Sequence, residues 1–344
     1  MRVAALSATV SALVAGSALA ATDLGSSHSR PAPTAARLTS GTAAPPAAPP
    51  GSPEARIDAI WAAARARHPE PRVYTNTTDR PIDCDHLKCI AFTFDDGPSP
   101  ATTGTLLRIL AAHHVRATFM LVGQMVEADP AAVAGEARAG DMLGIHTWSH
   151  QSLRGRAVPN IADDIVRTSN AITKASGYRP MVVRPPYGAV GPKTAAEVPY
   201  PLIKWGIDSE DWRSRNPDAV FRQVTSTAAP GSIVLMHDTY ASTIAAVPRL
   251  LDYYASRGYT FVTVSELYDS VLQPHRVYFG REKAVAAGRA ADRRAGVVRA
   301  PWMDQAAPGE PASAPTEPAP APTEPAAPPA EAATAPPSPA SDRR

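Results

Sequence analysis

The chain has 344 residues and a formal net charge of +2 at pH 7. This length suits one large domain or two smaller ones, and the weak charge argues against a nucleic-acid or membrane-surface partner. Most of the 37 prolines lie near the two ends of the chain. We therefore expect one folded domain at 84–274, large enough to bury a sizeable core, with flexible flanks.

The first residues, 1–20, have the pattern of a secretory signal. Arg2 precedes a mostly small and apolar stretch, and Ala18-Leu19-Ala20 fits the small-x-small cleavage pattern. The apolar stretch is shorter than the about 20 residues that cross a bilayer. We expect a secreted, extracellular protein without a membrane span, which can associate with a cell wall.

Two segments before the domain carry further information. Residues 21–83 are a Pro/Ala-rich linker by composition, interrupted by a helix-like stretch at 57–67. Cys84 and Cys89 are the only cysteines. In an exported chain they are expected to form a disulfide. The alternative is a metal-binding pair, but no second pair completes a zinc site.

Strand-like and helix-like segments then alternate along the chain. The predicted strands are 89–94, 117–122, 142–146, 181–183, 202–205, 232–236 and 259–264. The predicted helices are 102–113, 130–139, 160–176, 217–228, 244–257 and 266–272, the last with Ser265 as its cap. This order predicts parallel βαβ units. About seven such units fit an α/β barrel with its chemistry at the C-terminal ends of the strands, and a doubly wound open sheet fits the same periodicity.

Residues 275–344 begin with a basic stretch and end in a Pro/Ala-rich segment in which APTEP occurs twice. The basic stretch lacks the interleaved aromatic residues that stack on bases. We expect a solvated, disordered tail by composition.

Carboxylates and histidines directly follow two of the predicted strands. Asp95 and Asp96 are adjacent carboxylates, which repel unless a cation or an arginine separates their roles. His146 and His150 would share one face if their segment were helical, a spacing suited to a divalent metal. An Asp-His-His set would leave coordination positions open for water and substrate. An Asp-rich turn and a chance pair of histidines are the structural alternatives.

Other polar residues follow the later strands. Arg184 precedes two prolines, which would present its guanidinium rigidly to a carboxylate. His237 can act as a general acid if a carboxylate keeps it protonated, and Asp211 is a candidate for that carboxylate. Trp212 can form a wall for a sugar or be a half-buried core residue.

Together and in this order, these segments resemble the polysaccharide deacetylase family (NodB-homology domain, carbohydrate esterase family 4). The resemblance covers about 89–272. It is carried by TFDDGP at 93–98, HTWSH at 146–150, RPPY at 184–187, DSEDW at 208–212 and IVLMH at 233–237. It implies a distorted (β/α)7 barrel.

The resemblance also implies a role for each matching residue in catalysis. Asp95 would be the general base, held ionised by Arg184. His237 would be the general acid, oriented and kept charged by Asp211. The backbone N–H of Tyr187 would help to stabilise the oxyanion.

A second group of matching residues would bind the metal and the substrate. Asp96, His146 and His150 would be the metal ligands. Leu235 would line the pocket for the acetyl methyl group, and Trp212 would wall the sugar groove. Zn²⁺ suits these ligand types, and Co²⁺ or Ni²⁺ would also bind them.

The activity expected from the resemblance is hydrolysis of N-acetyl groups on N-acetylglucosamine polymers such as peptidoglycan or chitin, by a monomeric enzyme. An acetyl xylan esterase is the alternative on the same site, because amide and ester cleavage share a tetrahedral intermediate. A non-catalytic carbohydrate-binding wall protein is disfavoured because all the expected ligand, base and acid positions are filled. A structural wall protein that acts through its Pro-rich ends is a further alternative.

Overall fold

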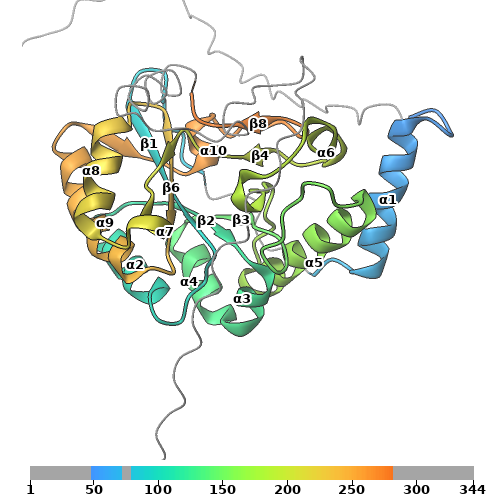
Figure 1. The fold of residues 1–344 in the computed structure, drawn as a ribbon, viewed down its shortest axis with the longest axis horizontal. Helices are drawn as coiled ribbons and strands as arrows, with labels where there is room; N and C mark the ends of the chain where they lie inside the picture. The colour runs from blue at the N-terminus through green and yellow to red at the C-terminus, as the bar shows by residue number, and fades with distance from the viewer. Residues whose placement is uncertain (1–47, 72–78, 282–344) are drawn as a thin grey trace, which may run out of the picture. The chain divides into compact units, whose positions relative to one another are not determined.

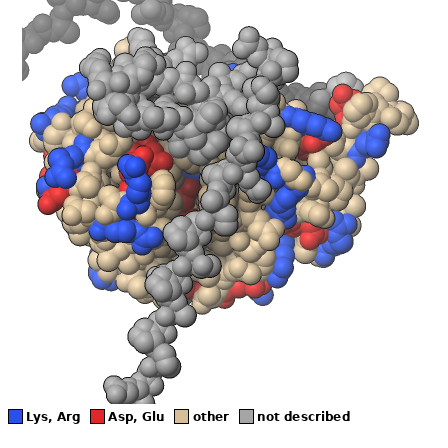
Figure 2. Space-filling model, in the orientation of Figure 1, with Lys and Arg blue, Asp and Glu red and all other residues tan. Residues whose placement is uncertain are grey.

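The computed structural model of the chain describes residues 48–71 and 79–281 (Figure 1). The expected signal sequence at 1–20 and most of the expected tail lie outside these ranges. Within them, no helix combines the length and the apolar character needed to cross a membrane. Basic and acidic side chains are intermixed on the face shown in Figure 2, in keeping with the small net charge.

The centre of the fold is a parallel β-sheet with the first strand in its interior. Its strand order is β3-β2-β1-β6-β5, and β7 pairs with the first residues of β1. Because the pairs are parallel, the C-terminal ends of the strands meet at one edge. The bounds are β1 Lys88–Asp95, β2 Thr118–Leu121, β3 Met142–Ile145, β5 Ile207–Asp208, β6 Ser232–His237 and β7 Tyr259–Phe261.

Single bridges extend this curved sheet beyond β3. Val183 bridges Ile145 on one side and the first residue of β4 (Leu202–Ile203) on the other. β4 in turn pairs with β8 (Val277–Tyr278). The strand predicted at 181–183 is therefore wrong in extent, since only Val183 forms bridges. Prolines on both sides of this segment cannot donate ladder hydrogen bonds.

Helices form an outer layer around the strands. Neighbouring helices pack on one another in the order α8, α9, α2, α4, α5 and α1 (Figure 1). A doubly wound sheet would carry helices on both faces, so the fold is the expected distorted (β/α)7 barrel. The bounds are α1 Pro53–Arg67, α2 Thr103–Ala112, α3 Gly123–Ala128, α4 Pro130–Ala139, α5 Val158–Ser176, α8 Pro217–Thr227 and α9 Ala241–Ala255.

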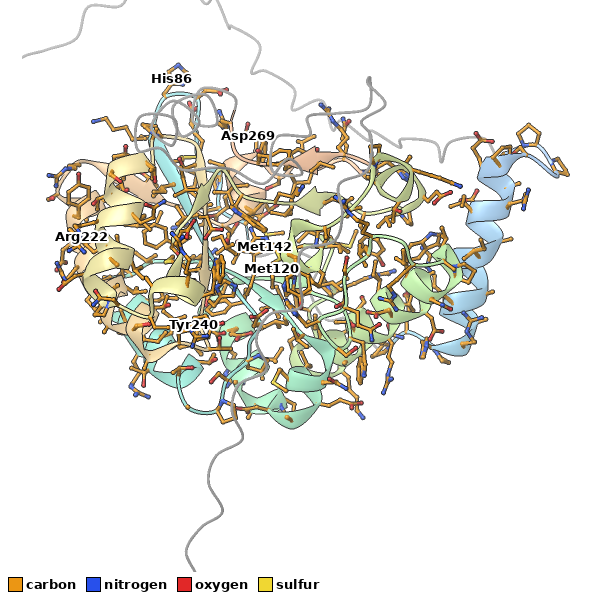
Figure 3. The ribbon with its side chains drawn as sticks, in the orientation of Figure 1. His86, Met120, Met142, Arg222, Tyr240 and Asp269 are labelled. Atoms are coloured by element: carbon orange, nitrogen blue, oxygen red, sulfur yellow. A yellow bond between two sulfur atoms is a disulfide. The ribbon has the colours of Figure 1, made fainter. Side chains whose placement is uncertain are left out.

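Alternation along the strands divides the apolar core into an outer and an inner part. In β1, Ile90 and Phe94 belong to the cluster that packs against the helices, whereas Ala91 belongs to a separate cluster inside the barrel. Met120 and Met142, from β2 and β3, join that inner cluster (Figure 3). Every second strand residue thus points into the barrel.

Several helices begin where proline and a capping side chain coincide. Asp129 accepts a hydrogen bond from the backbone of Ala132 and starts α4 before Pro130. Asn216 does the same for α8 before Pro217. Both features favour a helix start because they leave fewer unsatisfied N–H groups.

The helix-like stretch at 57–67 is a docked helix. α1 begins earlier than predicted, because Pro53 occupies the first turn and Ser52 accepts a hydrogen bond from Ala55. Trp61 is buried, and its Nε1 donates to the carbonyl oxygen of Glu197 at 3.0 Å. The folded part of the chain therefore includes a segment that composition assigns to the linker.

The C-terminal boundary also differs from the expectation. The last predicted helix is shortened to α10 (Val264–Leu267), which is capped by Thr263 rather than Ser265 through a reciprocal capping box with Glu266. β8 lies beyond residue 274, where a disordered tail was expected, and it is ordered by pairing with β4. β5 has no predicted counterpart, and neither do four other short elements: α3, β8, α6 (Pro192–Glu197) and α7 (Asp211–Ser214).

Cys84 and Cys89 are joined by a disulfide, with a Cα–Cα distance of 5.5 Å. Both cysteines are buried, and Cys89 lies in β1. The bridge therefore holds the segment that enters the barrel against its first strand.

Candidate active site

The polar residues of the site lie on the inner faces of the strands, at the C-terminal ends. Asp95 lies on the same side of β1 as Ala91 and Thr93, and His237 lies on the same side of β6 as Leu235. Asp95 and His237 are direct partners in the register of these two strands. Both side chains therefore emerge inside the barrel at the C-terminal edge, where α/β barrels carry their sites.

Two further residues enter the same space from neighbouring segments. His146 directly follows β3, and its N–H donates to the carbonyl oxygen of Leu121. Arg184 follows the bridging residue Val183, and its N–H donates to the carbonyl oxygen of Ile145. Both backbones are thus fixed by sheet-like hydrogen bonds up to the residue that carries the functional group.

Left-handed backbone conformations turn the chain at four of the five motifs. The φ angles are 75° at Asp96, 65° at Thr147, 56° at His150, 59° at Tyr187 and 57° at Glu210. Such angles are uncommon outside glycine and cost of order 1–3 kcal/mol each. At Asp96 the turn ends the strand alternation, so two successive carboxylates both reach the site.

Asp96, His146 and His150 converge on one point. The Oδ1 atom of Asp96 lies 3.2 Å from His150 Nε2 and 3.5 Å from His146 Nε2. All three potential ligand atoms lie within 4.8 Å of one another. The two histidines do not share a helix face, because the segment is not helical and residues 148–150 form a bend; left-handed angles at Thr147 and His150 accompany the approach of the two rings.

The protonation pattern of this cluster fits a cation. His146 Nδ1 lies 2.7 Å from the carbonyl oxygen of Arg184, so it must carry the proton and leaves Nε2 as a bare acceptor. Burial lowers the pKa of His150 to about 4, so its ring is neutral at neutral pH. The buried Oδ1 of Asp96 has no hydrogen-bond partner within the described residues. An acceptor oxygen that faces acceptor nitrogens is satisfied by a metal ion between them.

Asp95 is held by a buried arginine. Arg184 Nη1 donates to Asp95 Oδ1 at 2.6 Å and to Thr93 Oγ1 at 2.7 Å. The other guanidinium donors reach the carbonyl oxygens of Ile203 and Lys204. Arg184 is fully buried, so this pairing fixes the position of the Asp95 carboxylate. The other carboxylate oxygen, Oδ2, lies 3.6 Å from His146 Nε2 and faces the cluster.

His237 and Asp211 form a second buried pair. His237 Nδ1 lies 2.8 Å from Asp211 Oδ1, and the backbone N–H of His237 donates to Asp211 Oδ2 at 2.7 Å. Burial acts to lower the pKa of His237, but the hydrogen bond and the charge of Asp211 outweigh it and raise the pKa to about 10. The Nε2 atom of this imidazolium lies 3.9 Å from Asp96 Oδ2 and points towards the cluster.

The residues expected to contact substrate lie around these groups. The Tyr187 ring packs against His150 with a centroid distance of 4.7 Å, and its backbone N–H makes no hydrogen bond within the described part of the chain. Trp212 is 48% exposed, so it is not a core residue, and Leu235 is buried in the inner cluster.

Two buried hydroxyl groups that were not predicted also hold the site. Thr93 accepts from Arg184 and donates to the carbonyl oxygen of Val234. Strand alternation could have identified it, because it lies two residues before Asp95. Thr243 in α9 donates to Asp211 at 2.7 Å. No local sequence signal connects Thr243 with Asp211.

A separate pocket lies beside the bend at residues 148–150. It has a volume of about 680 Å³ and is lined by residues of α1, the bend and α5. Its Asp163 pairs with Arg67, and its Asp164 pairs with Arg156. These contacts compensate much of its charge, and the ligand cluster is not part of its lining.

The fold and the site define an α/β barrel with an Asp-His-His cluster flanked by a carboxylate–arginine pair and a histidine–carboxylate pair. A family model described as polysaccharide deacetylase matches residues 83–201. The chain is 41% identical over 194 residues to the peptidoglycan-N-acetylglucosamine deacetylase PgdA of Listeria monocytogenes, which covers 56% of the chain. The chain spans only 42% of the length of that relative.

Two solved structures resemble the chain over almost their whole length. The T48 deacetylase, solved with substrate, is 37% identical and covers 57% of this chain and 99% of its own, with a TM-score of 0.56. A family 4 acetyl xylan esterase from Clostridium thermocellum, solved with cobalt, is 30% identical and covers 56% and 99%, with a TM-score of 0.53. The chain belongs to the polysaccharide deacetylase family.

Proposed function

We propose that this chain is a secreted, metal-dependent deacetylase that removes N-acetyl groups from N-acetylglucosamine polymers, with peptidoglycan as its substrate class. The name of the Listeria monocytogenes relative, a peptidoglycan-N-acetylglucosamine deacetylase, supports that substrate. The observation that carries the proposal is the convergence of Asp96, His146 and His150, with Asp95 and His237 beside them. This arrangement offers a Lewis acid, a base and an acid within one small space.

Asp96, His146 and His150 would hold the divalent metal. Zn²⁺ suits one carboxylate and two imidazoles, and Co²⁺ or Ni²⁺ would also bind. When bound, the ion would supply Lewis acidity towards the acetyl carbonyl. The hydrogen bond from His146 to the Arg184 carbonyl keeps the imidazole in the tautomer that can ligate.

Asp95 and His237 would carry the two proton transfers. Asp95 has one oxygen occupied by Arg184, and the free Oδ2 would accept a proton from the attacking water. His237 is kept protonated by Asp211 and would donate from Nε2 to the leaving sugar nitrogen. The products are acetate and a free amine.

Three residues would shape the substrate site. The unpaired backbone N–H of Tyr187 would donate to the oxyanion, a contribution of about 3 kcal/mol for comparable donors. Leu235 would contact the acetyl methyl group, and the exposed Trp212 would wall the sugar groove.

O-deacetylation of xylan is the second candidate function. The same base and acid can open an ester through a tetrahedral intermediate, and the acetyl xylan esterase from Clostridium thermocellum shares the fold. The ester does not need a protonated leaving group as strongly as the amide does. The Asp211-paired His237 suits a leaving amine, which must be protonated as it departs.

Secretion is supported by the signal-like residues 1–20 and by the buried Cys84–Cys89 disulfide, which is typical of oxidising compartments. The Pro/Ala-rich tail at 275–344 suits association with a cell wall. The protein is proposed to act as a monomer.

The test is acetate release from peptidoglycan, chitooligosaccharides and acetylated xylan, with and without a chelator. The proposal expects chelator-sensitive release from an N-acetylated polymer, restored by adding Zn²⁺ or Co²⁺. Release from xylan alone would favour the esterase. An absence of release from all three substrates in the metal-loaded protein would contradict deacetylation.

A further inference from the structure

Asp211 is bound on both of its carboxylate oxygens. Oδ1 accepts from His237 Nδ1 and from the backbone of Trp212, and Oδ2 accepts from the backbone of His237 and from Thr243 Oγ1. Three of these donors belong to residues that the motifs already include. The fourth, Thr243, comes from α9 and lies 32 residues away in sequence.

The hydroxyl of Thr243 is not used by its own helix. α9 begins without a side-chain cap, and the backbone N–H of Thr243 donates to the carbonyl oxygen of Tyr240. Thr243 is fully buried on a helix face that otherwise carries residues such as Val247 and Leu250. A buried hydroxyl costs stability unless it is hydrogen-bonded, and its partner here is Asp211.

This bond adds an anchor from α9 to the backbone donors that limit the rotation of the Asp211 carboxylate. A carboxylate turns readily about its terminal torsion, which has a broad and shallow profile. With Oδ2 anchored to α9 at 2.7 Å, Oδ1 is directed to His237 Nδ1 at 2.8 Å. The imidazole orientation, and therefore the direction of its Nε2 proton, then depends in part on a contact outside the motifs.

We infer that Thr243 is a positioning residue that aims the acidic proton of His237 at the leaving group, through Asp211. The inference rests on the proposed function, in which His237 is the general acid. It predicts a defect that depends on the leaving group. A sugar amine must be protonated as it departs, whereas 4-nitrophenolate departs as a stable anion and needs no acid.

The test compares Thr243→Val with Thr243→Ser on two substrates, an N-acetylated chitooligosaccharide and 4-nitrophenyl acetate. Removing a hydrogen bond to a charged group corresponds to a loss of about tenfold in rate. Thr243→Val should lower kcat on the amide by about this factor with KM almost unchanged. Thr243→Ser should restore the rate, and hydrolysis of the aryl ester should be the same in all three proteins.

Ser242→Ala is a matched control, because it removes a hydroxyl from the adjacent, half-buried position of the same helix. Thermal unfolding is followed for each variant. If Thr243→Val does not fold, Thr243→Ala provides the same comparison with less bulk. In an Asp211→Asn background, Thr243→Val should cause no further loss on the amide.

Equal losses on the amide and the aryl ester would overturn the inference, since they would reveal general damage to the site. An unchanged amide rate in Thr243→Val would also overturn it while leaving the deacetylase proposal intact. A wild-type protein that cleaves the aryl ester but no N-acetyl substrate would contradict the proposed function, and the inference would fail with it.

Discussion

The carbonyl oxygen of Arg184 accepts a hydrogen bond from His146 Nδ1 at 2.7 Å. The guanidinium of the same arginine donates to Asp95 at 2.6 Å. One buried residue thus sets the tautomer of a proposed metal ligand with its backbone and holds the proposed base with its side chain. Arg184 therefore positions both the proposed metal ligand His146 and the proposed base Asp95.

Arg184→Lys should impair both catalysis and stability. A lysine keeps the charge but cannot serve Asp95 and the carbonyl oxygens of Ile203 and Lys204 together. We expect a loss of about 3 kcal/mol in the free energy of unfolding, since a buried charge loses partners, and a fall in kcat of about tenfold or more. Urea unfolding and acetate release measure the two effects.

Arg179→Lys is the control for that variant, because Arg179 forms a partly exposed pair with Glu70. It should change stability by less than about 1 kcal/mol. Full stability and full activity in Arg184→Lys would show that the guanidinium fork is dispensable.

The raised pKa of His237 predicts pH-dependent stability in the metal-free protein. The folded pKa, about 10, lies above the reference value of 6.5, so protonation favours the folded state. This contribution is complete below about pH 6.5 and is lost as the pH rises towards about 10. The stability difference between wild type and His237→Gln should therefore narrow between about pH 6 and about pH 9.

That difference is measured by chemical unfolding in the presence of a chelator. A gap that stays constant or widens with rising pH would mean that His237 is not held protonated in the folded state.

Glu136 should destabilise the protein at neutral pH. It is fully buried on α4, and neither carboxylate oxygen has a hydrogen-bond partner within the described residues. Burial, and then the charge of Asp238, raises its pKa well above the reference value of 4.5. Below about pH 4.5 the carboxyl group is protonated in both the folded and the unfolded state, so it carries no charge penalty. As the pH rises above about 4.5, the free energy of unfolding falls.

Glu136→Met should raise the free energy of unfolding by about 1–3 kcal/mol at pH 7 and by less near pH 4.5. The exposed Glu127 of α3 offers the control substitution Glu127→Met, expected to be neutral within about 0.5 kcal/mol. A destabilised Glu136→Met at pH 7 would indicate that the ionised carboxylate has a structural partner.

Trp61→Ala tests whether α1 is part of the folded domain. The indole is buried and bonded to Glu197, so its loss should cost about 3–5 kcal/mol. Trp61→Phe should cost less, because it keeps most of the packing and loses only the hydrogen bond. Equal stability of Trp61→Ala and wild type would show that α1 does not contribute to the stability of the folded domain.

Strand alternation explains how much of the site could be read from the sequence. Asp95 and His237 each end a strand on the same face as small or apolar inner residues, so both had to point into the barrel. Their meeting needs only that β1 and β6 be neighbours, which an α/β barrel provides.

Other features depended on contacts that no local pattern records. His146 and His150 meet through left-handed angles at Thr147 and His150 and not through a shared helix face. β8 forms only through its pairing with β4, and its sequence is too short to show alternation. Thr243 reaches Asp211 through the packing of α9, which long-range topology alone determines.

The central claim is that Asp96 is a metal ligand and its neighbour Asp95 a base. The most direct measurement is the Zn²⁺ content of purified Asp96→Ala and Asp95→Asn, together with acetate release from N-acetylated chitooligosaccharide. The account predicts that Asp96→Ala loses the metal and the activity, whereas Asp95→Asn keeps the metal and loses turnover. Full acetate release by Asp95→Asn, or normal metal content in Asp96→Ala, would contradict it.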